Sequence, residues 1–238
     1  MKKIFWLIYK TVFLDFFYRI YFHGSKINIP VTTEDLPKIK KNLPTIFYGN
    51  HICWFDFMFL MKALRLKKTD FKLVATKMNQ IIFPGLAASV IPVASRRLIA
   101  GWGGRSLKAI ADSSIEQISS AEANQMNRQV ISLAVATLQE NKKLIIFPDG
   151  GLGRGWKNGL GFIIEEYFKN NPQRKLYLQP VYFSGVREAD LMKKNFLKLL
   201  GFDHQLTSQI KFGQEIILQK EKREAREIVA DLQESYFE

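Results

Sequence analysis

Residues 45–64, TIFYGNHICWFDFMFLMKAL, change from a strand-like pattern to a helical pattern, and this change indicates the fold class. The first five residues, Thr45–Gly49, form a short run of β-branched and aromatic side chains that is typical of a buried strand. From Asp56 onward the sequence DFMFLMKAL has a helical pattern. A strand that is followed directly by a helix predicts an α/β unit.

The alternation of strands and helices continues along the chain. The expected strands are 45–49, 71–76, 91–94, 144–147 and 176–183, and the expected helices are 56–66, 80–89, 124–141, 160–169 and 220–234. This order predicts one α/β domain over residues 25–238, with a central mostly parallel or mixed sheet flanked by helices. Because ligands of such sheets bind beyond the carboxyl ends of the strands, we expect the chemistry in the loops after Gly49, Ala94 and Phe147.

The composition points to an anionic partner and away from nucleic acid. The chain has 35 Lys and Arg against 22 Asp and Glu, a net charge of +13, and it contains 19 Phe. Such a basic balance suits anionic lipid, an acidic carrier or a phosphate-bearing substrate, and the high Phe content favours lipid over nucleic acid. The single Cys allows no internal disulfide and no two-cysteine metal site, which fits a reducing compartment.

Residues 1–24 predict a helix that lies in the membrane interface. The segment is apolar around most of its circumference, with Lys10, Asp15 and Arg19 on one narrow polar stripe. These charges argue against a simple span, and a signal peptide would need an uncharged apolar run and a cleavage site. We therefore expect a peripheral or monotopic protein at the cytoplasmic face of a membrane. The alternative is a core helix with a thin solvated edge.

His51 and Asp56 are the candidate catalytic pair. Five positions along a regular helix correspond to about 140°, so the two side chains meet only if His51 lies in the turn before the helix and Asp56 in its first turn. The carboxylate would then hold the proton on Nδ1 and leave Nε2 as a general base. A structural His51 is the alternative. We expect no metal site, because His23 and His204 do not stand at ligand spacing, and we expect a buried, inert Cys53.

Residues 144–161, LIIFPDGGLGRGWKNGLG, predict an anion-binding loop. Six of the fifteen glycines of the chain lie in it, and Arg154 and Lys157 add positive charge. Glycines let a ligand approach backbone N–H groups closely. The loop lacks the ending of a Walker loop and the spacing of a dinucleotide-binding loop. The alternative is an ordinary surface turn.

Four blocks in this order resemble those of the glycerolipid acyltransferase family, typified by 1-acyl-sn-glycerol-3-phosphate acyltransferases. They cover roughly residues 45–185. The N-H-x-x-x-x-D block of the family matches in full at residues 50–56. The second block resembles Lys77, Pro84-Gly85 and one of Arg96 and Arg97. The third block is F-P-D-G-G-L-G-R at 147–154, followed by W-K-N-G, where the family has F-P-E-G-T-R-S-R. The fourth block is Gln179-Pro180-Val181.

The resemblance implies a role for each matching residue. His51 and Asp56 would be catalytic, and the substrate-binding residues would be Lys77, Arg96, Arg97, Asp149, Gly150, Gly151, Arg154 and Lys157. The third block departs from the family at Asp149 and Gly151 and also at Leu152, which replaces an Arg associated with the phosphate of the acceptor. Either the remaining cations share that contact or the acceptor differs. Residues 101–124 appear as an insertion, which is either a flap or a surface loop.

The implied reaction moves a fatty acyl group from acyl-CoA or acyl carrier protein to a hydroxyl of a lysophospholipid or glycerol-phosphate acceptor. It needs no cofactor beyond this co-substrate. One alternative is a lipid hydrolase or thioesterase that uses the same pair on water, although the G-x-S-x-G sequence of the serine hydrolases is missing. The other is a non-enzymatic basic protein that binds membranes or nucleic acid.

Overall fold

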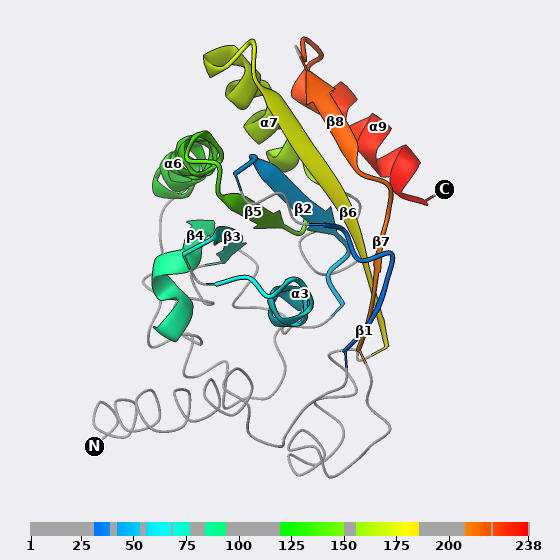
Figure 1. Cartoon of the computed structure of the whole chain (residues 1–238). Helices are drawn as coiled ribbons and strands as arrows, with labels where there is room; N and C mark the ends of the chain where they lie inside the picture. The colour runs from blue at the N-terminus through cyan, green and yellow to red at the C-terminus, as the bar shows by residue number, and fades with distance from the viewer. Residues whose placement is uncertain are drawn as a thin grey trace, which may run out of the picture.

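The computed structural model describes residues 31–38, 42–52, 56–67, 69–76, 84–93, 120–149, 156–185, 208–219 and 221–237 (Figure 1). Its elements are β1 Val31–Glu34, β2 Thr45–Gly49, α3 Asp56–Leu64, β3 Phe71–Thr76, the 3₁₀ helix η2 Pro84–Ser89, β4 Val90–Val93, α6 Ser120–Gln139, β5 Lys143–Ile146, α7 Gly159–Asn170, β6 Lys175–Gly185, β7 Ser208–Phe212, β8 Ile216–Gln219 and α9 Ala225–Phe237.

One eight-stranded mixed sheet forms the centre of the domain. Its order is β1-β7-β6-β2-β5-β3-β4, and β8 also pairs with β6. The strands from β6 through β2, β5 and β3 to β4 are parallel neighbours, whereas β7 and β8 run antiparallel to β6. The carboxyl ends of β2, β5 and β6 therefore lie at the same edge of the sheet, and the predicted α/β domain with a mostly parallel or mixed sheet is confirmed.

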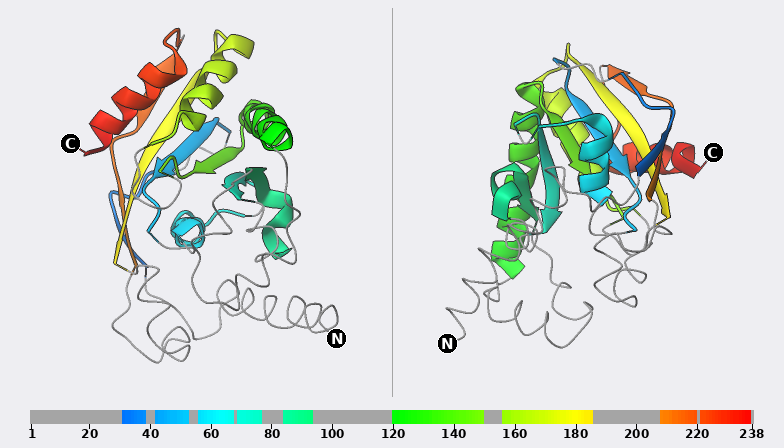
Figure 2. Two further views of the ribbon diagram at one scale, coloured as in Figure 1. Left: turned by 180° about the vertical axis from the view of Figure 1, so that it is seen from behind. Right: turned by 60° about the horizontal axis from the view of Figure 1, so that its bottom comes forward.

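Helices cover both faces of this sheet (Figures 1 and 2). On one face α3 packs against a core that includes Phe47 and Ile145. On the other face α6, α7 and α9 pack against a core that includes Ile46 and Leu144. Successive residues of β2 and β5 thus point to opposite cores, which is why every position of these two strands is buried.

The boundaries of the five predicted strands are confirmed to within two residues. Residues 80–89 were expected to form an α-helix, and the described part of this range is the 3₁₀ helix Pro84–Ser89 instead. A segment of six residues that begins with Pro and runs straight into β4 suits the short, tight 3₁₀ form. α6 begins at Ser120, so the last residues of the supposed insertion 101–124 belong to this helix.

The last helix starts five residues later than predicted, at Ala225 instead of residue 220. Glu227 lies in its first turn and accepts a hydrogen bond from the backbone N–H of Glu224 at 3.1 Å. This contact resembles half of a capping box and marks Glu224 as the residue at which the helix begins.

The sequence patterns did not predict the strands β1, β7 and β8.

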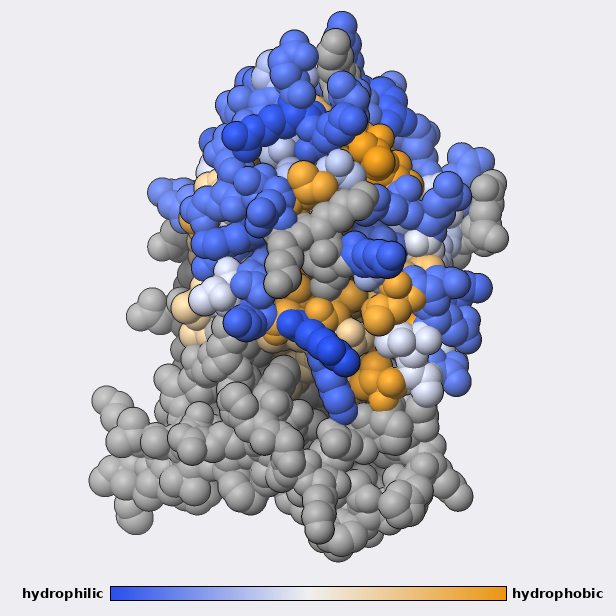
Figure 3. All heavy atoms as spheres, in the orientation of Figure 1, coloured by the Kyte–Doolittle hydropathy of each residue, from blue (hydrophilic) through white to orange (hydrophobic). Residues whose placement is uncertain are grey.

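Most of the described surface on the side shown in Figure 3 is hydrophilic, with smaller apolar groups between the polar side chains. Four large apolar side chains in the described ranges are substantially exposed, and they lie in different parts of the fold: Leu36, Leu133, Phe162 and Ile217. None of the described helices is long and apolar enough to cross a membrane. Residues 1–24 lie outside the described residues, so the interfacial helix stays a prediction.

Candidate active site

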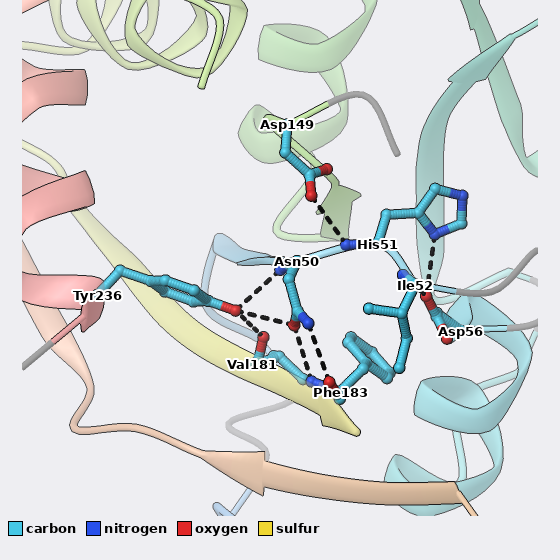
Figure 4. A network of polar contacts seen from close by, with 8 residues as sticks. All are labelled: Asn50, His51, Ile52, Asp56, Asp149, Val181, Phe183 and Tyr236. Atoms are coloured by element: carbon cyan, nitrogen blue, oxygen red, sulfur yellow. Dashed lines mark hydrogen bonds and ion pairs between the residues drawn. The ribbon is translucent and has the colours of Figure 1, made fainter. Parts of the chain in front are cut away.

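His51 and Asp56 meet at the carboxyl end of β2. His51 lies in the turn after this strand, and Asp56 is the first residue of α3. The Nδ1 atom of His51 lies 3.0 Å from Oδ2 of Asp56, and the same oxygen accepts the backbone N–H of Ile52 at 2.7 Å (Figure 4). The contact has the geometry that the spacing of the two residues predicts, while their catalytic role stays a prediction.

The surroundings of the pair leave one side of the imidazole accessible. The side chain of Asp56 is 1% exposed, whereas that of His51 is 23% exposed. An ionised carboxylate only accepts hydrogen bonds, so it holds the imidazole proton on Nδ1 and leaves the lone pair on Nε2. In Figure 4 the second ring nitrogen points away from Asp56. This arrangement can deprotonate a hydroxyl or a water molecule that reaches the exposed side of the ring.

The imidazole rests against an aromatic wall. Phe147, the residue after β5, stacks on the His51 ring with centroids 4.6 Å apart and an angle of 18° between the planes. Phe183 of β6 contacts Phe147 edge-on at 5.9 Å, and Ile52 packs against the same core. A base beside an apolar wall suits a substrate that has an apolar chain next to its reacting group.

Asp149 connects the glycine-rich block to the histidine turn. Its Oδ2 accepts the backbone N–H of His51 at 3.2 Å, and the residue is 8% exposed. The backbone N–H of Lys157 donates to the carbonyl of Pro148 at 3.1 Å, which joins the two ends of the glycine-rich stretch. Asp149 was predicted to bind substrate, and this role stays a prediction. In the structure one of its oxygens positions the backbone of the candidate base.

Asn50 is a site residue that the sequence analysis quoted but gave no role. Its side-chain Nδ2 donates to the carbonyl of Phe183 at 2.9 Å, and its Oδ1 accepts the Phe183 N–H at 2.8 Å. The side-chain amide therefore pairs with both the N–H and the C=O of Phe183, beyond Gly49 and Val181, the last residues of β2 and β6 that pair in the ladder. An Asn that directly follows a strand and precedes a His was the available signal, because its amide carries the donor and acceptor of a peptide group.

Gly49 and Tyr236 complete the contacts of this turn. A Cβ at Gly49 would lie 1.9 Å from the carbonyl oxygen of Val181, so only glycine allows this approach of β2 and β6. Tyr236, from α9, accepts the backbone N–H of Asn50 at 2.8 Å. Burial is the main cause that raises the pKa of Tyr236. Sequence analysis missed this residue, which stands 186 positions from Asn50.

Of the remaining predicted binding residues, the described residues include Lys157. Lys157 is exposed and directly follows Trp156, which packs against the core on the far face of the sheet. The other predicted residues lie outside the described residues: Lys77, Arg96, Arg97, Gly150, Gly151 and Arg154. Within the described ranges, no group of three His, Cys, Asp or Glu side chains is placed to hold a metal ion.

Comparison with known proteins identifies the family. The family model named Acyltransferase matches residues 29–184, which is more than half of the chain. The chain therefore belongs to the acyltransferase family, and the resemblance drawn from the four sequence blocks is confirmed. Tyr236 and the rest of α9 lie beyond the matched range.

Structural comparison finds four matching chains. One is the crystal structure of the 1-acyl-sn-glycerophosphate (LPA) acyltransferase PlsC from Thermotoga maritima. It has a TM-score of 0.43 and 13% sequence identity, and the match covers 85% of this chain and 68% of that one. The comparison with curated proteins finds no match.

Proposed function

We propose that this enzyme transfers a fatty acyl group from an acyl thioester to a hydroxyl of a lysophospholipid or glycerol-phosphate acceptor. The observation that carries the proposal is the 3.0 Å contact between the partly exposed imidazole of His51 and the buried Asp56, in a chain of the acyltransferase family. The apolar wall of Phe147 and Phe183 beside the imidazole supports a fatty acyl chain as the group that is moved.

In the proposed reaction, Nε2 of His51 takes the proton of the acceptor hydroxyl as the oxygen attacks the thioester carbonyl. The carboxylate of Asp56 stabilises the imidazolium that forms, without taking the proton itself. The tetrahedral intermediate then collapses, the carbon–sulfur bond breaks, and the thiolate leaves with the proton from Nε2. The products are the new ester and a free thiol, and no covalent intermediate on the enzyme is needed.

Charge and location complete the proposal. Acyl-CoA and acyl carrier protein are both anionic, which suits a chain with a net charge of +13. We propose that Lys157, Arg154 and the cations at 96 and 97 contact the phosphate of the acceptor. We also propose that residues 1–24 hold the enzyme at the cytoplasmic face of a membrane, where the acceptor and the product reside.

The test uses the purified full chain in detergent or liposomes, with labelled acyl-CoA and then acyl carrier protein as donors. A panel of lyso-lipids and glycerol phosphates serves as acceptors, and His51→Ala is compared with the wild type. We expect an ester product that depends on His51 and on one acceptor class. Free fatty acid formed at the same rate without any acceptor would favour a hydrolase, and equal ester formation by His51→Ala would exclude the proposed base.

A further inference from the structure

The last helix of the chain contacts the turn that carries His51. Tyr236 of α9 is 4% exposed, and its hydroxyl lies 2.8 Å from the backbone N of Asn50, 3.0 Å from Oδ1 of Asn50 and 2.8 Å from the carbonyl oxygen of Val181 (Figure 4). Asn50 immediately precedes His51. The hydroxyl therefore lies between Val181 of β6 and Asn50, the first residue of the turn.

The hydroxyl of Tyr236 both donates and accepts hydrogen bonds at this position. A tyrosine hydroxyl has one hydrogen to donate and can also accept. It accepts from the N–H of Asn50, so its own hydrogen is shared between the two oxygens that lie within 3.0 Å, those of Val181 and Asn50. Because burial raises the pKa of Tyr236, the hydroxyl keeps its hydrogen at neutral pH. Without it, the N–H of Asn50 would lose the partner described here.

The aromatic ring of Tyr236 makes a second, separate set of contacts. It stacks on Tyr182 with centroids 4.3 Å apart and contacts Trp156 at 5.0 Å. Trp156 stands at the end of the glycine-rich stretch, next to Lys157, whose backbone is hydrogen-bonded to Pro148. The ring thus packs near the third block while the hydroxyl contacts the first block. The substitution Tyr236→Phe removes only the hydroxyl contacts.

We infer that Tyr236 is a positioning residue that acts through Asn50 on the direction of the His51 side chain. Asp56 holds the turn from the face of the sheet that α3 covers, and Tyr236 holds it from the opposite face, where α9 packs. Tyr236 holds the backbone N–H of Asn50, and Asp149 holds that of the next residue, His51. A shift at Asn50 therefore moves the imidazole relative to Asp56. The effect on rate rests on the proposed function, whereas the effect on the imidazole does not.

The chain offers a matched control in Tyr48. Its ring lies 6.2 Å from that of Tyr236, it is 1% exposed, and in the described structure its buried hydroxyl has no hydrogen-bond partner. Tyr48→Phe therefore makes the same chemical change in the same layer without breaking a hydrogen bond. We expect this variant to be as stable as the wild type or slightly more stable, since a buried hydroxyl without a partner costs free energy.

The first measurement is an NMR spectrum of the imidazole groups of the ¹⁵N-labelled full chain. The chain has only three histidines, so His23 and His204 serve as internal references and His51→Gln assigns the third signal. In Tyr236→Phe we expect the His51 signals to shift and its Nδ1 proton to exchange faster with solvent. Tyr48→Phe should leave them in place. Unchanged His51 signals in a folded Tyr236→Phe protein would overturn the inference.

The second measurement is the steady-state rate per folded molecule with saturating acyl donor. For Tyr236→Phe we expect kcat to fall about tenfold with KM nearly unchanged, because small displacements of a reacting group cost rate more than binding. An Asn50→Ala background removes the Oδ1 contact with Tyr236 and keeps the backbone N–H contact. In this background the same substitution should cause a smaller further loss than in the wild type, since coupled residues are not additive. Loss of stability with unchanged kcat would reduce Tyr236 to a structural residue and overturn the inference. If the wild type transfers no acyl group, the proposed function fails, and the NMR result alone decides.

Discussion

Asp56→Asn separates the charge of the carboxylate from its geometry. One oxygen of Asp56 accepts both the His51 Nδ1 contact at 3.0 Å and the Ile52 N–H at 2.7 Å. The backbone N–H of Ile52 can only donate, so it selects the carbonyl oxygen of an introduced Asn at this position. That oxygen still accepts the Nδ1 proton of His51. The variant therefore keeps these two contacts and the tautomer of the imidazole, while it loses the negative charge of the carboxylate.

The expected loss of rate follows from the distance between the two charges. A nitrogen–oxygen contact of 3.0 Å places the imidazolium and carboxylate charges about 4 Å apart, and at an effective dielectric constant of about 20 their attraction is about 4 kcal/mol. Solvent reaches the His51 side chain, which is 23% exposed, and reduces this value. We therefore expect a loss of about 2–4 kcal/mol of transition-state stabilisation, or about 30- to 1,000-fold in kcat.

The assay is acyl transfer to the best acceptor of the panel, with folding checked by circular dichroism and urea unfolding. Asp70→Asn is the matched control, because Asp70 also accepts a backbone N–H, from Lys67 at 3.1 Å, but on an exposed turn away from the pair. This control should keep normal kcat. Asp56→Ala should lose more than Asp56→Asn in both rate and stability, since it also leaves the Ile52 N–H without its acceptor. A kcat for Asp56→Asn within about threefold of the wild type would refute the role of the charge.

Three further predictions test the packing around the site. Gly49→Ala should give an unfolded or insoluble chain, because its Cβ would meet the Val181 carbonyl oxygen at 1.9 Å. The control is Gly159→Ala, whose Cβ would have nothing within 4 Å. In urea unfolding this control should be neutral or should stabilise the chain by about 0.5 kcal/mol. Phe147→Ala should lower kcat/KM more for long than for short acyl donors, and an equal loss for all lengths would argue against an acyl chain along this wall. Burial lowers the pKa of Lys143 to about 8, so between pH 8 and 10.5 the unfolded chain binds more protons than the folded one, and stability rises with pH there. The difference in unfolding free energy, wild type minus Lys143→Met, should therefore grow by about 2 kcal/mol from pH 7 to 9.5, and a constant difference would contradict the shift.

The parts of the fold that were predicted from the sequence are those with a local signal. β2 and β3 are apolar runs between turn residues, and their observed bounds equal the predicted ones. The strands that were missed have weaker local signals. β1 is short and mostly exposed, and β8 alternates between half-buried and exposed positions. β7 shows a clean alternation of buried and exposed residues, but only over five positions. Strands this short become recognisable only by their pairing with distant strands.

The same limit explains which site residues were found. His51 and Asp56 stand five positions apart, so the turn between a strand and a helix was enough to predict their contact. Asn50 pairs with Phe183 across 133 positions, and it pairs with Tyr236 across 186. No pattern within one element predicts such contacts, because the chain between the partners folds in ways that a single sequence does not reveal. Asp149 lies between these cases, since its block was recognised but its contact with the His51 backbone was not.

The residues that position His51 differ from those that would recognise the acceptor. Asp149 replaces the Glu of the family block and is one methylene shorter, yet its carboxylate still reaches the N–H of His51 at 3.2 Å. The other two departures, Gly151 and Leu152, lie in the part of the block that the resemblance associates with the acceptor phosphate. Asp56, Asp149 and Tyr236 contact the turn that carries His51. By the resemblance, the replacements Gly151 and Leu152 would instead lie near the phosphate of the acceptor. On this reasoning we expect the changes at Gly151 and Leu152 to affect the recognition of the acceptor more than acyl transfer itself.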